Sequence, residues 1–116
     1  MPEVGDVPAA DDAKLVTLAR SARARSGGAE GAAVRDAMGR TYVSGAVPLR
    51  SLRLTALQAA VAAAVASGAV SVVAVAVAAD APAVTEADRA LLAEVGATVA
   101  LLAGPDGGVT EVPLAG

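Results

Sequence analysis

Two residue types that carry much of enzyme chemistry are missing from this 116-residue sequence, which contains no cysteine and no histidine. Histidine is the commonest general base and metal ligand, and thiolates complete many zinc sites. The sequence therefore excludes disulfides, thiolate zinc sites and histidine-based catalysis. Carboxylates, amides and arginines remain as the groups that could act on a ligand.

Glu86 and Asp88 are two carboxylates that could together bind a hard cation such as magnesium. They also follow Thr85, a residue suited to cap a helix, and the helix dipole favours acids in a first turn. We favour the capping interpretation and predict no metal here. The segment 105–108 (PDGG) is interpreted only as a hairpin turn.

Basic residues are concentrated in the first half of the chain. Residues 14–53 contain eight basic residues and two acids, a local net charge of +6, whereas the whole chain carries −3. A basic face could bind RNA phosphates or an acidic protein, and it could equally be a solvated surface or pack across subunit contacts. Tyr42 is the only aromatic residue, so the stacking typical of single-strand binders is not available. RNA binding is therefore the less favoured of these possibilities.

The uncharged stretch 54–79 is the element around which the fold must be built. Its first part is rich in alanine and carries larger residues at helical spacing, which predicts a helix over 54–66 that is packed on most sides. A run of valines then predicts a strand over 70–77 that is covered on both faces. This stretch raises the question of a membrane helix, but its change of period and its polar interruptions argue against one.

The flanking elements complete an α/β fold. We predict a flexible tail over 1–11, a helix from Asp11 or Asp12 to residue 25, strands over 30–35 and 40–45, a connection over 46–53, a helix over 86–95, and strands over 98–103 and 109–114. This order predicts a three-layer α/β/α sandwich, in which a mixed five-stranded sheet carries helices on both faces. Residues 12–116 form the one expected domain, and we expect it to be cytoplasmic because no secretory signal is recognisable.

Four segments in this order resemble the small zinc-dependent cytidine deaminases: residues 15–25 (LVTLARSARAR), 34–45 (VRDAMGRTYVSG), 54–69 (LTALQAAVAAAVASGA) and 88–96 (DRALLAEVG). The resemblance implies the fold predicted above and assembly as homotetramers or dimers through the central helices. In that family a Cys-Ala-Glu or His-Ala-Glu triplet opens the central helix, and a Pro-Cys-x-x-Cys motif opens the next one. These motifs supply three zinc ligands and the glutamate that shuttles protons.

The motif positions of the family fall on residues that do not match its chemistry. The triplet falls on Ala56, Leu57 and Gln58, and the two thiolates fall on Thr85 and Asp88. An alanine cannot bind metal, and an amide cannot act as a general acid or base at neutral pH. The family's ribose contacts fall on the segment 45–49 (GAVPL), which lacks them. We therefore expect no bound zinc and no catalytic residue.

Three functions follow from this pattern. The first is a catalytically inactive scaffold or interaction protein that forms a homo-oligomer and has a possible protein partner. The second is a nucleoside-binding regulator whose remnant pocket uses Gln58, although a buried Gln58 bonded to nearby backbone is the simpler interpretation. The third is a divergent cytidine deaminase in which Asp88 or a partner chain supplies the chemistry.

Overall fold

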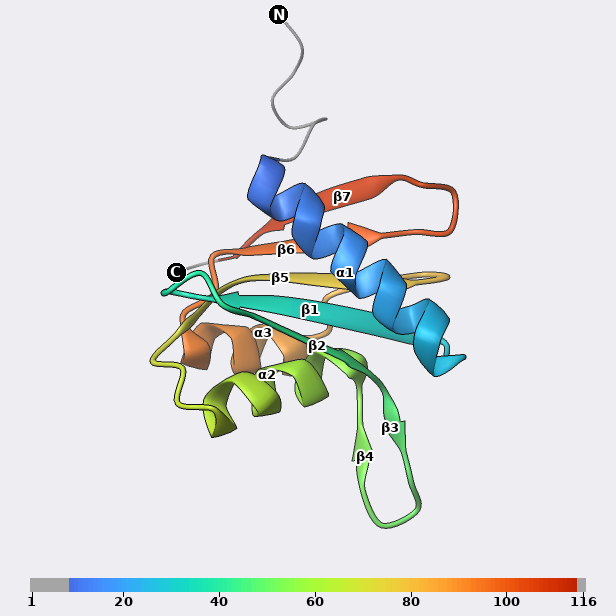
Figure 1. Cartoon of the computed structure of the whole chain (residues 1–116), viewed down its shortest axis with the longest axis horizontal. Coiled ribbons are helices and arrows are strands. Elements are labelled where there is room, and N and C mark those ends of the chain that lie inside the picture. The colour runs from blue at the N-terminus through green and yellow to red at the C-terminus, as the bar shows by residue number, and fades with distance from the viewer. Residues whose placement is uncertain (1–8, 115–116) are drawn as a thin grey trace, which may run out of the picture.

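The computed structural model describes residues 9–114, which form one five-stranded sheet between two layers of helices (Figure 1). The strands are β1 (Glu30–Asp36), β2 (Thr41–Gly45), β5 (Val72–Ala79), β6 (Val99–Ala103) and β7 (Val109–Pro113), arranged in the order β2-β1-β5-β6-β7. Only β5 and β6 are parallel, so the sheet is mixed as predicted. Helix α1 (Ala10–Ser26) covers one face, while α2 (Ala56–Ala66) and α3 (Glu86–Val95) cover the other. The predicted three-layer sandwich is confirmed.

The sheet separates two apolar cores that contain no phenylalanine or tryptophan. The α1 face packs Leu15, Val16 and Ala19 against small residues of β5 and β6 and against Leu101. The face under α2 and α3 is built around Leu57, Leu92 and several valines. Because alanine fills so many of these positions, the helices lie close to the sheet and each leucine carries a large share of the buried area.

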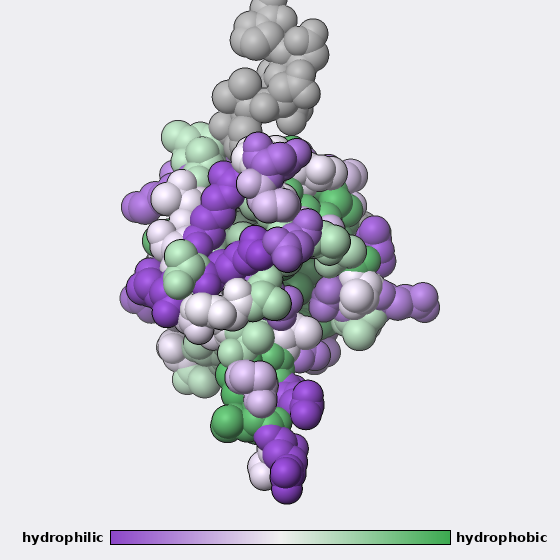
Figure 2. All heavy atoms as spheres, turned by 90° about the vertical axis from the view of Figure 1, so that its right-hand side faces the viewer, coloured by the Kyte–Doolittle hydropathy of each residue, from purple (hydrophilic) through white to green (hydrophobic). Residues whose placement is uncertain are grey.

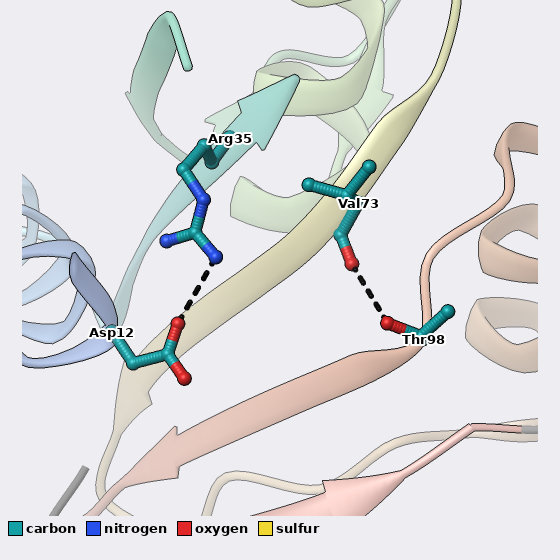
Figure 3. Close-up of polar contacts among 4 residues, drawn as sticks. All are labelled: Asp12, Arg35, Val73 and Thr98. Carbon is teal, nitrogen blue, oxygen red and sulfur yellow. Dashed lines mark hydrogen bonds and ion pairs between the residues drawn. The ribbon is translucent and has the colours of Figure 1, made fainter. Parts of the chain in front are cut away.

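The starts of α1 and β5 differ from the prediction. Helix α1 begins at Ala10, with Ala9 as its N-cap residue and no side-chain cap. Asp12 does not cap the helix, because its carboxylate accepts a hydrogen bond from the Arg35 guanidinium at 3.1 Å (Figure 3). Residues 10 and 11 of the predicted tail are thus helical, and residues 1–8 lie outside the described part. Strand β5 begins at Val72, because pairing with β1 sets its start, and Val70 is almost fully exposed.

The predicted connection 46–53 contains a second small hairpin. Strands β3 (Val47–Pro48) and β4 (Arg53–Leu54) pair antiparallel and project from the body of the molecule (Figure 1). Two residues per strand are too few to give the alternation that predicts a strand. Leu54, predicted as the first residue of the central helix, therefore belongs to β4.

Helix α2 is also less buried than predicted. Its inner side is covered by the sheet, but Ala62, Ala63, Val65 and Ala66 on its outer side are exposed within one chain. No helix in the described range 9–114 is long and apolar enough to cross a membrane.

Asp36 is a buried carboxylate that fixes the turn between β1 and β2. Its oxygens accept hydrogen bonds from the Met38 and Arg40 amides, each at 2.9 Å, and from the Tyr42 hydroxyl at 3.0 Å. Burial alone raises the pKa of Asp36, but the bonds from Arg40, Tyr42 and Met38 outweigh it and hold the pKa below the ordinary 3.8. The bond to Asp36, together with burial and the charge of Asp36, raises the pKa of Tyr42 above 10.0.

These two shifts predict that stability declines at both ends of the pH scale. The Asp36 contribution is present above pH 3.8 and is lost as pH falls through the lower folded pKa. The Tyr42 contribution is present below pH 10.0 and is lost as pH rises through the higher folded pKa. Urea denaturation at a series of pH values measures both. Asp36→Asn should flatten the acid limb and Tyr42→Phe the alkaline limb, and unchanged limbs would contradict this assignment.

Candidate functional site

Helices α2 and α3 both begin with a reciprocal side-chain cap, and residues at their starts line one cavity. The Thr55 side-chain oxygen Oγ1 accepts a hydrogen bond from the backbone amide of Gln58 at 3.0 Å. In return, the Gln58 side-chain oxygen Oε1 accepts one from the backbone amide of Thr55 at 2.9 Å. Thr85 and Asp88 repeat this reciprocal arrangement at 3.1 Å in each direction. Each pair satisfies two backbone N–H groups that a helix start leaves without partners. The predicted helix cap at Thr85 is confirmed, and Gln58 proves to be part of a cap as well.

Glu30 is the third polar group at this place. It comes from the start of β1, and its Oε1 accepts a hydrogen bond from the Ala56 amide at 2.9 Å. A carboxylate at a helix N-terminus is favoured by the exposed N–H groups and by the helix dipole. This residue was not predicted from the sequence. Its position as a single acid before the apolar segment GAAV marks the start of a strand but does not indicate its partner, which lies 26 residues away.

Two adjacent cavities share Glu30 and Thr55. One, of about 220 Å³, lies between the two helix starts and is also lined by Leu57, Thr85 and Asp88. The other, of about 270 Å³, is lined by Gln58 and by the hairpin residues around Pro48 and Arg53. The structure thus brings Thr85 and Asp88 together and places Gln58 in the neighbouring space. Ala56, fully buried, contributes its backbone amide to the Glu30 bond.

The donors at these positions do not match a zinc site. Among the described residues there is no group of three or more carboxylates that could hold a metal ion, and the chain has no cysteine or histidine. Tetrahedral zinc needs three protein ligands, and the carboxylates of Asp88 and Glu30 already accept backbone hydrogen bonds. These side chains therefore support no chemical step through a metal, and the absence of zinc stays a prediction.

Comparison with known proteins decides the family. The family described as "Cytidine deaminase-like" matches residues 8–108, which is most of the chain. The chain belongs to this family. Among curated proteins, none matches it in sequence.

Solved structures of cytidine deaminases share this cytidine deaminase-like fold. The enzyme from Burkholderia pseudomallei is 22% identical with a TM-score of 0.73, over 87% of this chain and 91% of that one. The enzyme from Mycobacterium leprae is 26% identical with a TM-score of 0.60, over 89% and 94%. A point mutant of the enzyme from Mycobacterium tuberculosis is 25% identical with a TM-score of 0.61, over 84% and 88%. The resemblance in fold and family predicted from sequence is confirmed.

The bond between Glu30 and the start of α2 predicts a graded response to substitution. Glu30→Ala should destabilise the protein by about 1 kcal/mol, because the Ala56 amide loses its acceptor. Glu30→Gln keeps an oxygen acceptor and loses only the interaction between charge and dipole, so its cost should be about 0.5 kcal/mol. Urea denaturation of both variants measures the difference. Equal stability of Glu30→Ala and the wild type would show that this carboxylate does not cap α2.

Proposed function

We propose that this chain is a non-catalytic cytidine deaminase-like protein that acts as a scaffold or interaction module. The best support is that the polar side chains at the two helix starts are engaged in capping the helices. The side chains of Gln58, Asp88 and Glu30 all accept hydrogen bonds from backbone N–H groups at the two helix starts. The side chain of Ala56 has no atom that could bind a metal. A deaminase needs zinc ligands and a carboxylate free to exchange a proton.

Assembly of several copies is part of the proposal. The outer side of α2, formed by Ala62, Ala63, Val65 and Ala66, is apolar and exposed in a single chain, and small residues let helices approach closely. We expect a dimer or tetramer, located in the cytoplasm, with a possible protein partner and without bound zinc, and RNA is the less favoured partner. Light scattering of the wild type should give a multiple of 11.1 kDa. Val65→Glu should give monomers, whereas Val70→Glu, outside the helix, should not. A monomeric wild type would contradict the proposed assembly.

A nucleoside-binding regulator is the second candidate. The cavity of about 270 Å³ beside Gln58 favours it, because the side-chain nitrogen Nε2 of Gln58 takes no part in the cap and could donate to a base. Thermal melting alone and with millimolar cytidine, deoxycytidine and uridine separates the two candidates. A ligand at about a hundred times its Kd adds roughly 2.7 kcal/mol, which for this size means several degrees. The scaffold proposal predicts no shift, and a shift removed by Gln58→Ala would replace it with the regulator.

A further inference from the structure

A cavity outside the candidate site lies on the other face of the sheet. It has a volume of about 500 Å³ and lies between the second half of α1 and the ends of β5 and β6. Its sheet wall is formed by Ala78 and Ala103, which pack in the α1 core, whereas Leu57 and Val77 of the candidate site belong to the other core. Neither the family's chemistry nor the proposed function uses this space.

Two arginines line this cavity. Arg20 and Arg23 come from successive turns of α1, and the rest of the lining is glycine, alanine and proline. Figure 2 faces the end of the molecule where α1 ends and the β6–β7 turn projects, and hydrophilic side chains gather there. Small residues leave room for a ligand to come close to both guanidinium groups, and a cavity of this volume is typical of small-molecule sites.

The two guanidinium groups differ in their partners. Arg23 donates to the Asp80 carboxylate at 2.6 Å, and the Asp80 side chain is 84% exposed, so a stronger anion can replace it. Arg20 forms no ion pair within the described part of the chain, and its Nη2 is buried without an acceptor there. A buried guanidinium nitrogen without an acceptor is unusual, because such donors are normally satisfied. Arg35 Nη1, which lies outside this cavity, is the other such nitrogen. What sets Arg20 apart is that it lines the cavity with a positive charge that no carboxylate of the described residues neutralises, so an incoming anion would be attracted to it.

We propose that this cavity binds the phosphate group of a small phosphorylated molecule. Guanidinium groups bind phosphate in a planar, two-bond geometry, and two of them match a group of charge near −2. Asp80, beside Arg23, and Asp106, in the turn next to Gly104, are the acids nearby, and Asp106 is already bonded to the Gly108 amide. A single-stranded RNA is less suited, because the cavity has no aromatic residue on which a base could stack.

Nuclear magnetic resonance of the wild-type protein with pyrophosphate tests this directly, at constant ionic strength. Gly27, Gly28 and Gly104 line the cavity, and their amide signals should shift in a saturable manner. Those of Gly39 and Gly68, in turns outside it, should stay in place. No saturable shift at millimolar pyrophosphate would overturn the proposal, and so would shifts spread equally over all five glycines. Because this readout uses the unaltered protein, it does not depend on how any variant folds.

Variants then identify the groups involved. Arg20→Gln should weaken pyrophosphate binding about tenfold or more, since a charged hydrogen bond is lost. Arg25→Gln, the matched control on the exposed side of the same helix, should change it less than about twofold. Asp80→Asn should keep or strengthen binding, because it releases Arg23. Equal weakening by Arg20→Gln and Arg25→Gln, or binding of a short RNA without binding of pyrophosphate, would show a diffuse charge effect and contradict the site. None of these outcomes bears on nucleoside binding beside Gln58.

Discussion

Replacing Gly31 with alanine is expected to destabilise this protein by about 3 kcal/mol or more. Gly31 lies in β1 directly under α1, and a Cβ atom there would collide with the backbone oxygen of Ala19 and the backbone nitrogen of Arg23. Backbone atoms of a helix cannot rotate away as a side chain can, so α1 would have to move off the sheet. Urea or thermal denaturation measures the loss.

Gly28→Ala is the matched control for this prediction, three residues earlier. Its Cβ would meet the Ser26 hydroxyl at 3.2 Å, the end of a side chain that can turn away, and the Glu30 backbone oxygen at 3.9 Å, which is an ordinary contact. Its effect should stay within about 1 kcal/mol. If the two variants were equally stable, helix α1 would not pack on β1 as closely as described, and the α1 face of the fold would need revision.

Truncating Leu101 to alanine is the second large effect, at about 2–5 kcal/mol. Leu101 is fully buried in β6 on the α1 face, and its neighbours there are mostly alanines, which cannot extend to fill the space left behind. Because a domain of this kind has about 5–15 kcal/mol of stability in total, this one change should bring the protein close to unfolding at body temperature.

Leu52→Ala removes the same atoms from the exposed tip of the β3–β4 hairpin, where half of the side chain's surface is accessible. It should change stability by less than about 0.5 kcal/mol. Chemical denaturation of the two leucine variants compares the stability cost of the same truncation at a buried and at an exposed position. A cost for Leu52→Ala as large as for Leu101→Ala would mean that the hairpin is covered in solution, as it would be in an oligomer that buries this tip.

Much of the architecture could be predicted from the sequence, because hydrophobic period and turn residues determine it locally. Every helix and every strand of the main sheet was predicted, with ends that shift by one or two residues for most of them. The ends of β5 and α1 could not be predicted, since they depend on pairing with β1 and on the Arg35 ion pair, both formed by residues far apart in the sequence. The hairpin β3–β4 was missed because its strands are too short to carry a pattern.

The candidate site was predictable only at the positions that local motifs mark. Thr85 and Asp88 follow a capping pattern and could be placed at a helix start, and so could Gln58 once Thr55 is recognised as its partner. Glu30 is 26 residues from the amide that it binds, so only the packing of β1 against α2 brings the two together. The cavity at Arg20 and Arg23 likewise could not be predicted from the sequence, because the basic residues of the stretch 14–53 are spread over several helices and strands.

Cytidine turnover by the purified protein tests the central claim most directly. The measurement follows conversion of cytidine to uridine at high protein concentration, with added zinc and without it, and uses the cytidine deaminase from Burkholderia pseudomallei as the active reference. We predict no conversion above the buffer blank in either condition. Conversion that scales with protein concentration and is lost in Asp88→Asn would contradict the non-catalytic proposal and make the chain a divergent deaminase.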